Sequence, residues 1–265
     1  MGQKLPFRTI LPDPNTKTPA NGNKPRIAIP EPCGYDTEYS NRSLPPYLRA
    51  VEAAGGEPII IPLASSPEEI ARIAANCSAV LLPGSKADVD PQKYNAPRHP
   101  QTAAADPRRD AADELLLQDA YNLRKPVLGI CYGLQSLNVW RTGTLVQHIQ
   151  SPINHEAGSK VEVAHQVLLE PDSLLAKDIA LGGRSIPVNS SHHQSAEIVG
   201  DGLRVVARSP EDQIIEALEG TQPGHYVLGV QWHPERGFER DPHSQSLFRS
   251  FIQSARSWPL THKPK

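Results

Sequence analysis

Short apolar runs alternate with segments of helical character over residues 26–140. The runs lie at Arg26–Ile29, Pro58–Pro62, Ala79–Leu82 and Pro126–Ile130. Strands in regular alternation with helices are typical of a parallel sheet that is covered by helices on both faces. The pattern therefore predicts an α/β fold with a doubly wound, mostly parallel sheet. Because the second run is continuously apolar, we expect it to be covered on both faces.

Four segments of this region predict helices. Leu44–Ala54 ends at a pair of glycines, and Ser66 is a typical N-cap for the helix that follows it. A long helix is expected from Asp106 to about Leu123, and a shorter one over Gly133–Trp140. These helices supply the connections that parallel strands require.

The second half of the chain has a different pattern. Apolar runs without clear helices between them lie at Val161–Leu169, Leu203–Ala207, Ile214–Leu218 and Tyr226–Gln231. Such runs predict strands. We therefore expect a small antiparallel annex on the same core, followed by a closing helix over Ser244–Arg256.

The sequence predicts one domain, because it contains no internal repeat and no separating linker. This domain is expected over residues 24–258, between a polar, disordered tail at 1–23 and a second tail at 259–265. The first tail lacks the apolar segment of a signal peptide. No run approaches the roughly 18 apolar residues of a membrane span, so no membrane contact is expected.

Charge and cysteine usage narrow the function further. The 27 basic and 29 acidic residues give a formal charge of −2, which argues against nucleic acid as the main partner. The cysteines, Cys33, Cys77 and Cys131, are odd in number and far apart, so they predict no disulfide framework. A reducing, cytoplasmic location is the simplest interpretation.

A cysteine follows the fourth apolar run directly. The segment from Gly129 to Gly133, with Cys131 at its centre, has the form of a nucleophile elbow with Cys in place of Ser. The amino end of the following helix would favour the reactive thiolate. The pentapeptide alone is equally compatible with a buried cysteine packed as a small apolar residue.

A histidine follows the last apolar run in the same way. His233 could act as the base that a thiol nucleophile needs, and Glu235 could orient its imidazole. Taken alone, the segment is better explained as a loop histidine beside a solvated carboxylate. The two motifs are informative only together.

In this order, the motifs around Cys131 and His233 resemble those of the class I glutamine amidotransferase superfamily. They resemble most its hydrolase branch, the peptidase C26 or γ-glutamyl-γ-aminobutyrate hydrolase family. The resemblance covers residues 24–256. It extends to Pro83-Gly84 with Asp88–Pro91, Arg109-Asp110 with Glu114, Leu137–Val139, Asn189–Gln194 and Ile215–Ala217.

The resemblance implies a flavodoxin-like sheet and a cysteine-dependent hydrolase of γ-glutamyl amides that forms a γ-glutamyl thioester. It implies that Cys131 is the nucleophile, His233 the base and acid, and Glu235 the orienting carboxylate. The implied substrate is a small molecule. The alternative is a glutaminase subunit that delivers ammonia to a separate synthase. A binding module without activity is disfavoured by the intact triad, and a homodimer is left open.

The resemblance also implies where substrate binds. The backbone N–H groups of Tyr132 and of Ser85 or Gly84 would form an oxyanion hole. Gln135, His193 and Tyr132 would contact the substrate. Tyr132 stands where the family commonly has Arg, and Ser85 where it commonly has a second Gly, so the substrate itself stays open.

Neither a metal site nor a cofactor is expected. His192 and His193 are adjacent, and adjacent side chains on a strand cannot usually both reach one ion. No zinc-type spacing surrounds them. The acidic residues over 106–113 are interpreted as charges at a helix start, and not as a second acid–base pair.

Overall fold

The computed structural model describes residues 24–261. The predicted tail at 1–23 lies outside the described residues. The closing helix, α7 (Pro242–Thr261), is longer than predicted and continues past the expected domain end at 258.

A central sheet of nine strands organises the described part of the chain, in the order β2-β1-β3-β4-β11-β10-β9-β6-β7. The first five are mutually parallel: β2 (Glu57–Ile61), β1 (Arg26–Pro30), β3 (Ala79–Leu82), β4 (Val127–Ile130) and β11 (Val227–Val230). These apolar runs are parallel strands because the helices between them return the chain to the same sheet edge. The predicted doubly wound sheet is thereby confirmed.

The other strands of the sheet run antiparallel to their neighbours. They are β10 (Ile215–Gly220), β9 (Leu203–Arg208), β6 (His165–Leu169) and β7 (Ser185–Val188). A separate two-stranded antiparallel sheet pairs β5 (Leu145–Val146) with β8 (Ser195–Ala196). The annex predicted from the second half is therefore present, and most of it extends the central sheet. The run expected in the annex at Tyr226–Gln231 is instead β11, which is parallel to β4.

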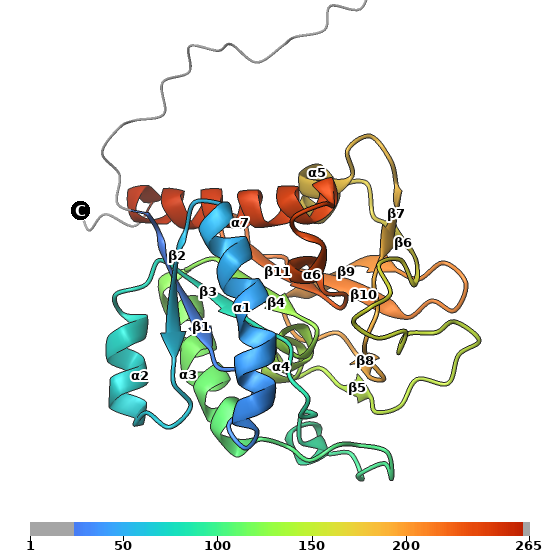
Figure 1. Cartoon of the computed structure of the whole chain (residues 1–265), viewed down its shortest axis with the longest axis horizontal. Helices are drawn as coiled ribbons and strands as arrows, with labels where there is room; N and C mark the ends of the chain where they lie inside the picture. Colours follow the sequence, from blue (N-terminus) through green and yellow to red (C-terminus); the bar gives the residue numbers. More distant parts are fainter. Residues whose placement is uncertain (1–23, 262–265) are drawn as a thin grey trace, which may run out of the picture.

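Helices cover both faces of the sheet (Figure 1). One face packs against α1 (Thr37–Ala53), α5 (Leu174–Ile179) and α7. The other packs against α2 (Pro67–Ala74), α3 (Pro107–Leu123) and α4 (Tyr132–Trp140). Two short elements complete the structure, the 3-10 helix η1 (Pro91–Tyr94) and α6 (Pro234–Gly237). No described helix is both long enough and apolar enough to span a membrane.

Two sequence predictions about α1 and β2 differ from the structure. Helix α1 begins at Thr37, ahead of the predicted Leu44, because the Asp36 side chain caps it by accepting the Tyr39 N–H at 2.9 Å. The prediction that the second run is covered on both faces is wrong. Strand β2 lies at the sheet edge, and Ile60 is 41% exposed.

Elements in the second half were the hardest to predict. Strand β6 begins at His165, and the expected start at Val161 is an exposed loop. Helix α5 and strands β5, β7 and β8 have no counterpart in the sequence prediction. Each has six residues or fewer, too short for a periodic pattern to stand out.

Two glycines let α4 pack directly against the strands before it. A Cβ on Gly129 would lie 2.6 Å from the Gly133 carbonyl oxygen, and a Cβ on Gly133 would lie 2.1 Å from that of Leu82. Both contacts are to backbone, which cannot move aside as a side chain can. The turn between β4 and α4 therefore requires glycine at both positions.

Replacing Gly133 by alanine should destabilise the fold. The added methyl group must push α4 away from β3, at a cost of about 1–3 kcal/mol or more in the free energy of unfolding. Denaturant unfolding followed by circular dichroism measures it. Gly183→Ala is the matched control, because its Cβ would have no neighbour closer than 3.6 Å. Equal stability of the two variants would contradict the packing argument.

Candidate active site

Cys131 occupies the sharp turn between β4 and α4. Its backbone has φ 54° and ψ −108°, a conformation that residues with a side chain rarely adopt. Its N–H donates to the Val230 carbonyl at 2.8 Å, which ties the turn to the end of β11. The strained turn presents the sulfur at the carboxyl edge of the sheet, where the nucleophile-elbow prediction placed it.

His233 reaches the same edge from the neighbouring strand. Strands β4 and β11 are parallel, and Ile130 pairs with Val230, so both chains leave the sheet side by side. The His233 side chain lies near Cys131: a Cβ on Gly84 would be 3.0 Å from His233 Cε1 and 3.6 Å from Cys131 Cβ. Its Nδ1 lies 2.8 Å from Glu235 Oε1. The structure thus brings the three predicted triad residues together.

The Asn189 side chain fixes the backbone of His233. The His233 N–H donates to Asn189 Oδ1 at 2.9 Å, and Asn189 Nδ2 donates to the His233 carbonyl at 2.8 Å. The Asn189 amide thus pairs with the backbone N–H and carbonyl of His233, much as a neighbouring strand would. Sequence analysis gave Asn189 no such role, because no local pattern links positions 44 residues apart.

The charges around His233 favour its protonated form. Burial alone would lower the pKa of this imidazole, but the negative charges of Glu235 and Cys131, together with the hydrogen bond to Glu235, raise the pKa to about 9. At neutral pH the imidazolium therefore stands between a carboxylate and the sulfur. This arrangement can stabilise a thiolate and can donate a proton.

The loop after β3 closes one side of the site. The Gly84 N–H donates to the Tyr47 hydroxyl at 3.0 Å, and that hydroxyl lies 3.5 Å from His233 Nδ1. A Cβ on Gly84 would lie 3.0 Å from His233 Cε1 and 3.6 Å from Cys131 Cβ, so the loop approaches both side chains closely. Because the Gly84 N–H is already bonded, Ser85 is the better of the two predicted oxyanion donors.

The Arg109 side chain binds the loop after β3. Its fully buried guanidinium pairs with Asp113 at 2.7 Å and donates to the carbonyls of Pro83 at 2.6 Å and Pro32 at 3.1 Å. It also stacks on the Tyr132 ring, with 4.8 Å from Cζ to the ring centroid. The buried ion pair thereby connects the loop after β3 to the start of α4.

The predicted helix-start role of the acidic residues over 106–113 holds for Asp106 and for Asp110, which lies in the first turn of α3. Asp106 caps α3 by accepting the N–H groups of Arg108 and Arg109. Asp113 pairs with Arg109 in the interior. Asp110 accepts a hydrogen bond from the Tyr132 hydroxyl at 2.5 Å. Through Arg109 and through the Tyr132 hydroxyl, the carboxylates of Asp113 and Asp110 help to hold Tyr132 in place.

A cavity of about 240 Å³ opens beside Cys131, at or just below the low end of the range for small-molecule sites. Acidic and basic side chains both line this cavity. The lining residues are Ser85, Lys86, Ala87, Asp88, Cys131, Tyr132, Gln135, Glu156, Ser191, His192, His193 and Gln194.

The three residues predicted to contact substrate all line this cavity, and each of them has a hydrogen-bond partner. His193 Nε2 lies 3.1 Å from Asp88, whose hydrogen bond raises the pKa of the imidazole. Gln135 donates its amide to the Gln194 carbonyl at 3.1 Å. The Tyr132 side chain is buried and its hydroxyl is bound to Asp110, so it does not supply the charge of the arginine common in relatives.

His192 and His193 face different surroundings, as expected for adjacent side chains. His193 points to Asp88, whereas His192 Nε2 lies 3.7 Å from Glu216 in β10. The sequence analysis missed Glu216 and two further histidines beside it, because no spacing rule connects them to His192. Together these four side chains form the cluster of the described residues that could hold a metal ion.

The chain has relatives among known proteins. The chain is 32% identical over 213 residues to protein NtpR of Enterococcus hirae, covering 78% of this chain and 87% of NtpR. It is 34% identical over 216 residues to the gamma-glutamyl-gamma-aminobutyrate hydrolase PuuD of Escherichia coli, covering 78% and 83%.

A solved structure from Thermoplasma acidophilum, that of a candidate GMP synthase subunit, shares the fold. It superposes with a TM-score of 0.64 at 16% identity, and covers 91% of this chain and 98% of that one. The family model of peptidase C26 matches residues 33–235, a range that includes Cys131, His233 and Glu235, the three residues of the predicted triad. The chain therefore belongs to the peptidase C26 family, whose members include glutamine amidotransferase-like hydrolases.

Proposed function

We propose that the protein hydrolyses γ-glutamyl amides through a γ-glutamyl thioester on Cys131. The observation that carries the proposal is the meeting of Cys131, His233 and Glu235 beside a small polar cavity. The name of the Escherichia coli relative supports the substrate class.

Acylation begins with attack of the Cys131 sulfur on the γ-carbonyl carbon. The carbonyl electron pair moves to oxygen, and the oxyanion is held by the backbone N–H groups of Tyr132 and Ser85. When the carbonyl re-forms, the C–N bond breaks and the imidazolium of His233 protonates the departing nitrogen. Because Nδ1 is bound to Glu235, Nε2 is the nitrogen that carries this proton.

Deacylation reverses the roles. Neutral His233 takes a proton from water as its oxygen attacks the thioester carbon. Collapse of the second tetrahedral intermediate breaks the C–S bond and releases glutamate. The sulfur leaves as a thiolate beside the re-formed imidazolium, which restores the starting ion pair. Glu235 keeps the ring oriented in both halves of the reaction.

The cavity walls suit the α-amino and α-carboxylate groups of a glutamyl substrate. A zwitterion needs both an acidic and a basic partner, and Glu156 and Lys86 both line the cavity. The ring of His193, held by Asp88, supplies a further polar contact. Gln135 is held by the Gln194 carbonyl and keeps the far wall in place.

Product analysis without any added partner tests the reaction. The chain alone should convert a panel of γ-glutamyl amides to glutamate and the intact amine. Cys131→Ala should lower the rate by about 10⁴-fold or more, as loss of a nucleophile does in serine proteases. Cys77→Ala is the control. Activity on glutamine alone, and only with a synthase added, would favour the alternative of an ammonia-delivering subunit.

A trapped intermediate tests the thioester. A slow γ-glutamyl ester, quenched in acid, should leave one γ-glutamyl group, which mass spectrometry places on Cys131. Cys33 and Cys77 should stay unlabelled, because burial raises the pKa of both thiols, that of Cys77 to about 11. A label on either of them, or full activity of Cys131→Ala, would refute the assignment.

The pH profile tests the role of Glu235. Since the raised pKa of His233 keeps it protonated below about pH 9, kcat/KM should fall as the pH rises through that value. Glu235→Gln removes a charge that raises this pKa, so the fall should move to lower pH. Glu239→Gln, on the exposed surface beyond α6, is the control. An unmoved alkaline limb in Glu235→Gln would contradict the proposed pairing.

A further inference from the structure

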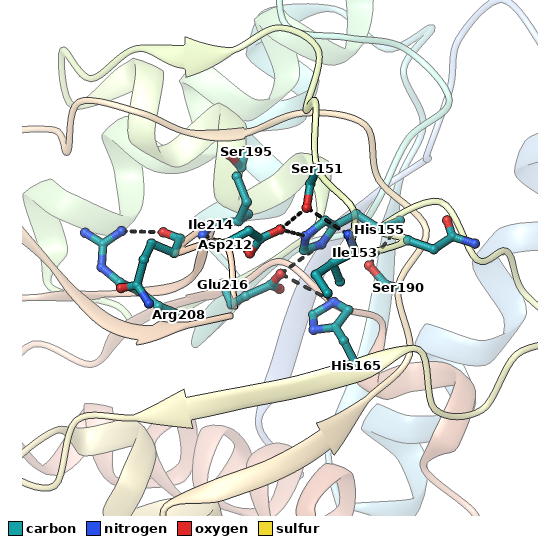
Figure 2. Close-up of polar contacts among 12 residues, drawn as sticks. Ser151, Ile153, His155, His165, Ser190, Ser195, Arg208, Asp212, Ile214 and Glu216 are labelled. Atoms are coloured by element: carbon teal, nitrogen blue, oxygen red, sulfur yellow. Dashed lines mark hydrogen bonds and ion pairs between the residues drawn. The ribbon is translucent and has the colours of Figure 1, made fainter. Parts of the chain in front are cut away.

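Four buried side chains meet beneath the wall of the cavity. They are His155, His165 at the start of β6, His192 before β8, and Glu216 in β10. Their exposed fractions are 3%, 8%, 4% and 0%. One nitrogen of each imidazole and one oxygen of the carboxylate lie within 4.8 Å of one another. Figure 2 shows His155, His165 and Glu216 pointing toward a common centre.

The tautomer of each histidine is fixed by its second nitrogen. In every case that nitrogen faces an oxygen that can only accept, so it must carry the proton. The acceptors are Asp212 Oδ2 for His155 Nε2 (2.8 Å), the Gln166 carbonyl for His165 Nδ1 (3.1 Å) and the Gln194 carbonyl for His192 Nδ1 (2.9 Å). In the neutral state, three lone pairs therefore point at the carboxylate of Glu216.

These lone pairs have no hydrogen-bond partner among the described residues, and neither do the two oxygens of Glu216. Glu216 Oε1 lies 3.3 Å from His155 Nδ1, 3.5 Å from His165 Nε2 and 3.7 Å from His192 Nε2. Buried acceptors that face one another without a proton or cation between them are strongly destabilising. The cluster therefore needs positive charge at its centre.

The separations from Glu216 fit a metal site, whereas the donor atoms, which lie within 4.8 Å of one another, would have to draw closer together on binding. Zinc bonds to nitrogen and carboxylate oxygen are about 2.0–2.2 Å, which puts neighbouring donors of a tetrahedron about 3.3–3.6 Å apart. The observed distances to Glu216 need only a slight contraction. The hydrogen bonds from the outer nitrogens to a carboxylate and to backbone carbonyls are those that orient metal-binding histidines. A dication would be balanced by the carboxylates of Glu216 and Asp212.

We propose that His155, His165, His192 and Glu216 bind one divalent transition metal ion, zinc in the first place, in a closed structural site. Four protein ligands complete a tetrahedron and leave no position for substrate or water, which distinguishes a structural from a catalytic site. The site departs from the sequence expectation of no metal. That expectation considered His192 with His193, whereas the partners of His192 come from distant segments.

The position of the ion gives it a role in shaping the active site. His192 lies in the segment between Asn189, which holds His233, and Gln194, whose carbonyl binds Gln135. An ion that joins this segment to β6 and β10 would fix the cavity wall relative to the central sheet. It takes no part in the chemistry at Cys131.

Metal analysis of the full chain tests the site. The protein is purified without a histidine tag, in a Cys131→Ala background that removes the competing thiolate. Elemental analysis should find about one zinc ion per chain. Chelator should remove it with a fall in melting temperature, and added Zn²⁺ should restore both. Co²⁺ in its place should give the intense visible absorption of a tetrahedral site, without a thiolate charge-transfer band.

Two substitutions in the cluster sharpen the test. Glu216→Gln and His165→Gln should each lower the metal content at least about tenfold, whereas His243→Gln, on α7 outside the cluster, should leave it unchanged. Should either cluster variant fail to fold, the cobalt spectrum of the unsubstituted cluster still decides. A chain that is purified without metal and binds neither Zn²⁺ nor Co²⁺ would overturn the proposal, and would mean that protons supply the charge.

Discussion

The close packing of α4 against the ends of β3 and β4 is the constraint on which the site depends. It holds Cys131 in a backbone conformation that costs of the order of 1–3 kcal/mol and that the chain would not adopt alone. Gly129 and Gly133 make the contact possible, because any side chain there would strike backbone. The buried guanidinium of Arg109 then fixes the neighbouring loop at Pro83 and the ring of Tyr132 in one network. The backbone geometry at Cys131 is thus maintained largely by groups that do not line the cavity.

The sequence predicted what local patterns determine. Strands β1, β3 and β4 are continuous apolar runs separated by helical segments, so their identity and their parallel arrangement could be inferred. Strand β11 was expected as part of the antiparallel annex, and its parallel place beside β4 is visible only in the fold. The residues that follow these runs, Cys131 and His233, could also be inferred. The burial of β2 could not, because an apolar run does not say whether its strand lies inside a sheet or at its edge. The contacts of Asn189 with His233 and of His192 with Glu216 were also beyond prediction. They join segments that only the fold brings together, with no periodicity or spacing to indicate them.

The segment from Asn189 to Gln194 contacts His233, the buried cluster and the opposite wall of the cavity. Asn189 bonds the backbone of His233, His192 faces the buried cluster at Glu216, and His193 meets Asp88 across the cavity. This stretch is largely irregular, and backbone hydrogen bonds tie it to neighbouring segments, from the His192 N–H to the His155 carbonyl at 2.9 Å and from the Ile149 N–H to the His193 carbonyl at 2.8 Å. Side chains of the sheet and of the loop after β3 add further contacts. The conformation of the buried cluster at Glu216 and that of the cavity wall therefore depend on each other.

The pairing of Ile130 with Val230 has a consequence for how the chain can vary in length. The chain leaves the two adjacent strands at the same edge of the sheet, so the separation of Cys131 and His233 is independent of the number of residues between them. Insertions in the connecting loops lengthen segments on the protein surface, at a small cost in conformational entropy. A single residue inserted within β4 or β11, by contrast, would turn the following side chain to the opposite face of the sheet. The loops around the cavity mouth can therefore change in length and sequence without moving Cys131 relative to His233.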